Sequence, residues 1–157
     1  MAYTTVDNPK LYFQTKLYTG NGGTQSITGV GFQPDWVWTK GRSGSYGVSN
    51  HKLFDSVRGA TKTLFGNLTL AESTQTNGLT SFDSDGFSLG DDSNVNDGST
   101  NYASWNWYTG ATTSSNSNGS ITSTVSANTT AGFSIVSYTG TGSNATVGHG
   151  LGVAPSM

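Results

Sequence analysis

Short segments of alternating residues, separated by turn-forming residues, run through the whole 157-residue chain. In residues 10–20, the side chains of Leu11, Phe13 and Leu17 fall on one face and the tyrosines on the other, which is the period of a half-buried β-strand. The same pattern predicts strands within residues 35–41, 80–90, 102–110 and 119–140, with a tight hairpin at Ser84–Asp85–Gly86. Short strands between such turns predict an all-β fold. We expect an antiparallel β-sandwich or barrel, with at most one short helix.

One segment leaves the choice between helix and strand open. Residues 53–65 carry apolar side chains at nearly helical spacing, but Gly59 lies inside the segment and β-branched residues interrupt it. We therefore expect either one short helix or a pair of strands around Gly59.

The composition excludes several classes of protein. Gly, Ser, Thr and Asn supply 81 of the 157 residues, and charged residues are only 10%, with a formal net charge of −2. Because there is no basic field for phosphates, we expect no nucleic-acid partner. No apolar run approaches the roughly 18 residues of a membrane span, and the N-terminal sequence does not resemble a secretory signal, so we expect no membrane partner. The lack of cysteine excludes disulfides, thiol catalysis and cysteine-ligated zinc.

An internal repeat gives the chain its organisation. Residues 18–37 read YTGNGGTQSITGVGFQPDWV and residues 138–157 read YTGTGSNATVGHGLGVAPSM. The Tyr-Thr-Gly blocks are offset by 120 residues and the Gly-x-Gly-x-x-Pro blocks by 121, and each copy follows an apolar strand. Repetition at this period indicates tandem units. We expect a β-sandwich domain at residues 1–110 and a linker or surface loop at 111–120. Residues 121–157 then either start a second unit or complete the first.

Five stretches of the chain carry a resemblance to a known family. They are YFQTKLYTGNGGTQSITGVGFQPDWVWTK, LFDSVRGATKTL, LTSFDSDGFSLG, YASWNWYTG and NTTAGFSIVSYTGTGSNATVGHGLGVAP. Together they resemble a tandemly repeated domain of marine bacteriophage virion and tail-fibre proteins. The resemblance implies an antiparallel β-sandwich of the jelly-roll or concanavalin-like type, similar to laminin-G and lectin domains. It also implies a place on the virion surface, and it brings no catalytic residues with it. In that family the next copy continues past the Gly-Leu-Gly-Val-Ala-Pro turn, and this sequence departs from the family pattern by stopping there.

An acidic segment offers oxygen ligands for a metal ion. Calcium binds about six to eight oxygens from carboxylates, amides and carbonyls. The candidate ligands lie between residues 83 and 97, although they lack EF-hand spacing: Asp83, Asp85, Asp91, Asp92, Asn94 and Asp97, with Asn96 among them. Calcium is the one cofactor that the sequence suggests, and the alternative is a pair of solvated turns.

The tryptophans form two Trp-x-Trp pairs, Trp36/Trp38 and Trp105/Trp107, and period-two spacing puts each pair on one face of a strand. We expect these side chains in the core, because the chain has few other bulky apolar groups. The alternative is an exposed platform for a sugar or a protein partner.

The sequence gives little support for a catalytic site. A Ser-His-Asp set could be drawn from His51, Asp55 and many serines, but no nucleophile-elbow pattern accompanies it. Asp83 and Asp85 are more simply turn residues than a glycosidase pair. We expect a non-enzymatic virion structural protein, in a tail fibre, receptor-binding tip or capsid decoration. Its partners would be further copies of itself, other virion proteins and a host cell-surface glycan or protein. The alternatives are a stand-alone carbohydrate-binding module and, after it, a glycan-degrading enzyme.

Overall fold

The computed structural model describes residues 6–44, 50–110 and 112–155, and these residues fold into antiparallel β-sheets with very little helix. The elements, in chain order, are η1 (Pro9–Leu11), β1 (Phe13–Thr19), β2 (Gln25–Ile27), β3 (Trp36–Ser43), β4 (Lys52–Asp55), β5 (Lys62–Phe65), β6 (Ser73–Thr74), β7 (Leu79–Asp83), β8 (Gly86–Leu89), α1 (Ser93–Asn96), β9 (Asn101–Trp107), β10 (Ser114–Asn116), β11 (Ser123–Asn128) and β12 (Phe133–Ser137). The predicted all-β antiparallel fold is confirmed.

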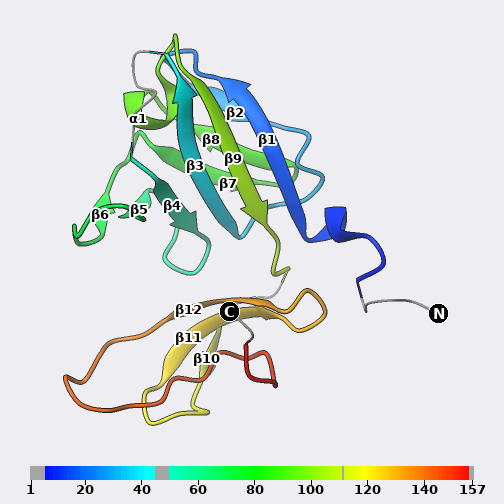
Figure 1. Ribbon diagram of the computed structural model, residues 1–157, viewed down its shortest axis with the longest axis vertical. Helices are drawn as coiled ribbons and strands as arrows, with labels where there is room; N and C mark the ends of the chain where they lie inside the picture. The colour runs from blue at the N-terminus through cyan, green and yellow to red at the C-terminus, as the bar shows by residue number, and fades with distance from the viewer. Residues whose placement is uncertain (1–5, 45–49, 111, 156–157) are drawn as a thin grey trace.

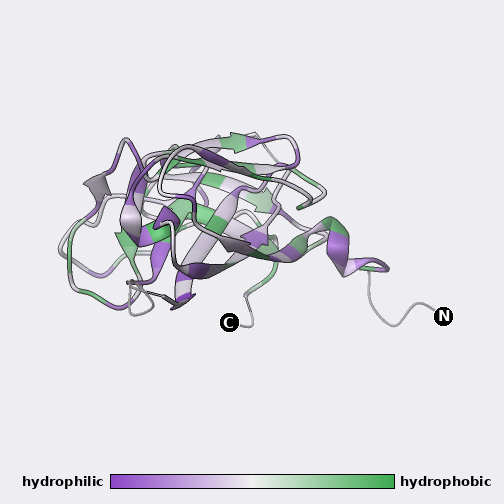
Figure 2. Cartoon of the chain, turned by 90° about the horizontal axis from the view of Figure 1, so that it is seen from above, coloured by the Kyte–Doolittle hydropathy of each residue, from purple (hydrophilic) through white to green (hydrophobic). Residues whose placement is uncertain are grey.

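Two sheets form a sandwich. The larger has the strand order β1-β9-β3-β4-β5-β6, and the smaller has the order β2-β8-β7 and lies behind it in Figure 1. The core lies between them and is fully or nearly fully buried: Ile27, Val37, Phe54, Leu79, Phe87, Leu89 and Val95. Hydrophobic and hydrophilic residues alternate along these strands (Figure 2), as one-sided burial of a sheet requires.

Local turn chemistry explains two hairpins. The segment that could have been a helix forms β4 and β5, with Gly59 between them at a φ of 99°, a conformation that glycine adopts readily. The expected hairpin at Asp85–Gly86 is present, because β7 and β8 pair with Asp83 opposite Gly86.

A third sheet, β10-β11-β12, lies apart from the sandwich, beyond the end at which β9 stops (Figure 1). Its hairpin touches the sandwich through Phe133, whose ring lies 5.9 Å from the ring of Trp107 and 6.5 Å from that of Trp36. The hydroxyls of Thr109 and Ser126 are 2.5 Å apart. The predicted loop at 111–120 contains strand β10. Residue 111 lies outside the described residues, as do residues 1–5, 45–49 and 156–157. The division at residues 110 and 121 stays a prediction.

The repeat is visible in the backbone as well as in the sequence. Gly22 and Gly142 have φ values of 71° and 74°. Gly29 and Gly150 have φ values of 76° and 77°, at the same positions of the two copies. Strand β12 lies in the second copy where β1 lies in the first, starting at Phe133 and Phe13 respectively. Residues 133–152 thus repeat the first strand of the sandwich and these glycine conformations, whereas the counterpart of β2 is a single bridge between Val147 and Ile121.

No helix in the described part of the chain is long and apolar enough to cross a membrane.

Candidate functional site

The predicted calcium ligands are spread over the β7–β8 hairpin and the segment around α1, and protein donors already occupy their carboxylates. The carboxylate of Asp85 accepts hydrogen bonds from the backbone N–H groups of Gly29 (2.9 Å) and Gly31 (2.6 Å), and these bonds lower its pKa. Asp83 accepts hydrogen bonds from the hydroxyls of Ser81 and Ser88. Both residues of the supposed acid pair therefore brace turns of the smaller sheet.

The remaining candidate ligands are also held locally. Asp91 accepts a hydrogen bond from the side chain of Asn77 (2.8 Å). Asp97 binds the hydroxyls of Ser99 and Thr100, and these bonds lower its pKa. Across residues 6–44, 50–110 and 112–155, no three His, Cys, Asp or Glu side chains gather as a metal site would require. The structure thus does not assemble the calcium cluster that the sequence suggested.

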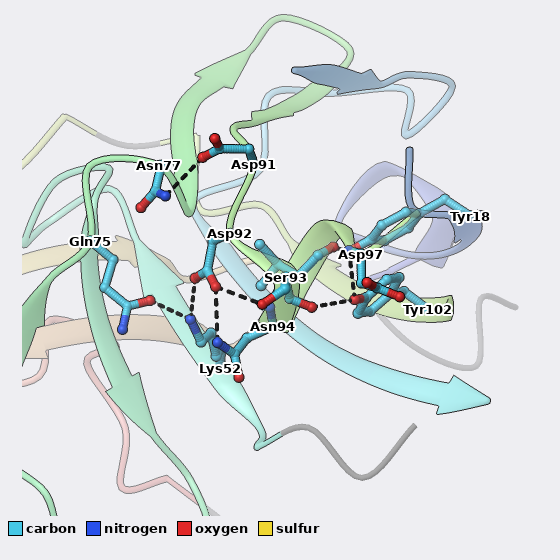
Figure 3. Close-up of polar contacts among 11 residues, drawn as sticks. Tyr18, Lys52, Gln75, Asn77, Asp91, Asp92, Ser93, Asn94, Asp97 and Tyr102 are labelled. Atoms are coloured by element: carbon cyan, nitrogen blue, oxygen red, sulfur yellow. Dashed lines mark hydrogen bonds and ion pairs between the residues drawn. The ribbon is translucent and has the colours of Figure 1, made fainter. Parts of the chain in front are cut away.

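Asp92 is the exception, because it binds a buried lysine (Figure 3). The side chain of Lys52 has no exposed surface, and its amine contacts Asp92 Oδ2 and Gln75 Oε1. The other oxygen of Asp92 accepts hydrogen bonds from the backbone N–H and the side-chain amide of Asn94. The ring of Phe65 covers the amine at 5.8 Å. An amine, a carboxamide and a carboxylate therefore meet beside the core.

Burial sets the charge balance of this cluster. Desolvation lowers the pKa of Lys52 against the opposing effect of Asp92. For Asp92, burial raises the pKa, but the hydrogen bonds from Lys52 and Asn94 outweigh it and the pKa is lowered. Sequence analysis did not single out Lys52. The only available signal was that Lys52 lies two residues before Phe54, so the two side chains share the face of β4 that packs into the core.

Two stacked tyrosines hold α1 against the larger sheet. The rings of Tyr18 and Tyr102 are 5.1 Å apart and nearly parallel. Their hydroxyls donate to the carbonyls of Val95 (2.9 Å) and Ser93 (2.8 Å). Burial raises the pKa of both hydroxyls, and the neighbouring Tyr102 adds to the effect on Tyr18. The acidic segment is thereby fixed beside Lys52 through α1.

The tryptophans are not in the core, and the expectation that placed them there is wrong. Trp36 lies opposite Trp107 and Trp38 opposite Trp105 in the register of β3 and β9, so all four side chains share one face of the larger sheet. That face is the outer one, because Val37, between the first pair, points into the core. All four tryptophans are half-buried. Tyrosine, valine and phenylalanine fill the inner face instead.

The outer face also carries a cleft of about 340 Å³ between the sandwich and β12. On the sandwich side it is lined by Trp36, Leu64 and the ion pair of Arg58 with Asp55, whose Nε–Oδ2 distance is 2.6 Å. The other wall is residues 134–138. An aromatic side chain beside an ion pair is a suitable surface for a polar ligand such as a sugar.

The hydrolase set does not assemble. His51 Nδ1 accepts a hydrogen bond from the indole of Trp38 (2.9 Å), and Asp55 binds the side chain and backbone N–H of Arg58. The two supposed triad members therefore have other partners.

Comparison with known proteins gives one match. A family model described as a domain of unknown function, DUF7483, matches residues 8–157. No curated protein and no solved structure matches the chain.

Proposed function

The chain belongs to the DUF7483 family, and we propose that it is a non-enzymatic structural module, one unit of a tandem array exposed on the surface of a bacteriophage virion. Within the virion it would serve in a tail fibre, a receptor-binding tip or a capsid decoration. The resemblance of its motifs to phage virion domains suggests the location, and the geometry of β12 supports the modular role.

The supporting observation is the direction in which β1 and β12 present their backbone groups. In an antiparallel strand, the N–H and C=O groups of alternate residues point to opposite sides. The carbonyl of Tyr12 accepts from Tyr108, and the N–H of Gly20 donates to Thr100, so the even-numbered residues of β1 face β9. The odd-numbered residues, beginning with Phe13, face the open edge of the sheet.

In β12 the odd-numbered residues are the paired ones. The carbonyl of Asn128 points toward β12, since it accepts from Gly132, and Asn128 lies opposite Phe133 in the register. Phe133, Ile135 and Ser137 therefore face β11. In the described part of the chain, β12 is the last strand of its sheet, so its even-numbered side has no partner strand. That side corresponds to the side on which β1 binds β9.

A strand like β9 from a further unit would fit this open edge in the register that β1 uses. Units joined in this way would build an array in which β12 of each unit is the first strand of the larger sheet of the next unit. Such a module needs no catalytic group. Its stability would come from sheet hydrogen bonds and from burial between units.

The assembly is tested by the mass of the purified chain in solution, measured by light scattering after size exclusion. We expect a discrete species of more than one chain. A clean monomer at all concentrations would contradict the homo-oligomeric role and would favour the second candidate function.

That second candidate is glycan binding, and the cleft beside Trp36 favours it. A sugar ring would stack on the indole, while the Arg58–Asp55 pair would hydrogen-bond its hydroxyls. Screening the chain and its Trp36→Ala variant against a glycan array tests this idea. Loss of a bound glycan in that variant, with binding kept in Trp105→Ala, would place a glycan site in the cleft.

A further inference from the structure

Lys52 is a buried amine that the proposed module does not use. It lies on β4, and its side chain runs along the inner face of the larger sheet without any exposed surface. Its register partner on β3 is Thr39, which is also buried. A lysine in such a place loses its hydration, and this loss requires compensation.

Two groups of different chemistry meet this amine (Figure 3). Gln75, which lies 23 residues further along the chain, presents its carboxamide oxygen to Nζ, and Asp92, 40 residues away, presents a carboxylate oxygen. The carbonyl carbon of Gln75 is one bond from the oxygen that contacts the amine, so an electrophilic carbon lies beside the nitrogen. From this arrangement we propose that Lys52 and Gln75 form an isopeptide bond in the folded chain, with Asp92 carrying the protons.

The reaction balances with the groups present. Asp92 takes a proton from the Lys52 ammonium, and the neutral amine attacks Cδ of Gln75. The Nζ–Cδ bond forms as the carbonyl becomes a tetrahedral oxyanion. The carbonyl then reforms and the Cδ–Nε2 bond breaks as Nε2 takes one proton from Nζ and leaves as ammonia. The other proton that Nζ lost is on Asp92, which returns it to the departing ammonia, giving ammonium, or to water. No oxidant, cofactor or second substrate is required.

The surroundings favour each part of this step. Only a neutral amine is nucleophilic, and burial lowers the pKa of Lys52 toward that form. Proton transfer within the pair also removes two opposite charges from a poorly hydrated site. The carboxylate side chain is 11% exposed, which leaves ammonia a route to solvent.

Gln75 is a better electrophile than Asp92. The second oxygen of Asp92 accepts two hydrogen bonds from Asn94, and these bonds favour the ionised carboxylate. Asp92 is neutral only while it holds the proton from Lys52, and it is otherwise an ionised carboxylate, which resists attack by an amine. The carboxamide of Gln75 has an uncharged leaving group, ammonia, once its nitrogen is protonated. The bond would tie β4 to the segment that follows β6, at the far edge of the larger sheet from β1.

The direct test is the intact mass of the unmodified chain, measured in denaturant. We expect a mass about 17 Da below that of the sequence, because ammonia is lost. Chymotryptic digestion should then give a branched peptide that joins Lys52 to Gln75. The Lys52→Arg variant keeps the cation but should have the full mass, while Lys62→Arg should retain the loss. Lys62 is the matched control because its amine donates to the hydroxyl of Thr74, the residue directly before Gln75.

Three results would overturn the proposal. The full sequence mass in the unmodified chain would mean that Lys52 and Asp92 form only an ion pair. A loss of about 18 Da with a Lys52–Asp92 branched peptide would show that the amine attacks Asp92 and not Gln75. A loss of ammonia confined to an unbranched peptide would instead mark a cyclic imide at an Asn-Gly sequence such as Asn77–Gly78, and it would persist in Lys52→Arg. The inference does not depend on the virion role, since the mass is the same whether the chain assembles or not.

Discussion

Asp35 joins the sandwich to the segment that leads into the third sheet, and removing its carboxylate should destabilise the chain strongly. The residue is 7% exposed. Its Oδ2 accepts hydrogen bonds from the backbone N–H groups of Thr109 (2.8 Å) and Gly110 (2.9 Å), and its Oδ1 accepts one from the hydroxyl of Ser56 (2.8 Å). Three donors from two parts of the chain thus depend on one side chain.

The cost of Asp35→Ala follows from the donors that it leaves without an acceptor. A buried donor left without a partner costs about 1–3 kcal/mol. The N–H of Thr109 is buried and that of Gly110 is partly buried, so the two together give roughly 3 kcal/mol. With a urea m-value of about 2 kcal/mol/M, the unfolding midpoint should fall by about 1.5 M. Asp35→Asn should cost roughly half as much, because its carbonyl can still accept from the two N–H groups while its amide donates to the Ser56 hydroxyl.

Urea titration followed by tryptophan fluorescence measures these midpoints. Asp91→Ala is the matched control, because Asp91 is exposed and binds a single side chain, that of Asn77. Its free energy of unfolding should stay within about 0.5 kcal/mol of that of the unmodified chain. If Asp35→Ala moved the midpoint no further than Asp91→Ala, the Asp35 carboxylate would not be holding the segment that follows β9, and the reasoning would fail.

Three further predictions follow from the turns and the repeat. Calcium or a chelator should leave the melting temperature unchanged, because the acidic side chains do not converge; a rise of several degrees with calcium would contradict this. Acid should destabilise the chain, because folding lowers the pKa values of Asp85, Asp92 and Asp97. The stability that these carboxylates give is present above about pH 4 and is lost as the pH falls through their folded pKa values. Urea titrations at pH 7 and pH 3 would detect this loss. Deleting residues 121–157 should leave a folded first unit with a cooperative thermal transition, and loss of that transition would mean that these strands belong to its core.

Several strands and hairpins could be predicted because their turns are local, whereas the order of the strands in the sheets could not. The Asp85–Gly86 dipeptide was enough to place the β7–β8 hairpin. Period-two alternation was enough to place β1, β3 and β9. Gly59 at positive φ decided between helix and strands for the segment between β4 and β5. In each case the deciding residues lie within a few positions of the structure they produce.

The faces of the strands could not be predicted in the same way. Alternation puts Trp36 and Trp38 together, but it does not say which face is inside. The inner face is chosen by the opposing sheet, where Phe87 and Leu89 pack on Val37 and Phe54. The wider tryptophan side chains were left on the outer face, where Phe133 covers two of them.

The cluster of Lys52, Gln75 and Asp92 could not be predicted from the sequence either. Its members come from β4, the turn after β6 and the N-cap of α1, and they are brought together only by the folded sheets. The acidic segment misled the sequence analysis for the same reason. Each aspartate there satisfies nearby donors, so proximity in sequence did not become convergence in space.

The most direct test of the modular account is amide hydrogen exchange in a chain extended after Pro155 by a second copy of residues 35–110. We predict that the added copy folds and that the amides of Ser134 and Val136 become protected, because a second β9 pairs with the open side of β12. The amides of Phe133 and Ile135, which β11 already holds, should change little. An added copy that folds while Ser134 and Val136 exchange as fast as before, or an added copy that does not fold, would contradict the account.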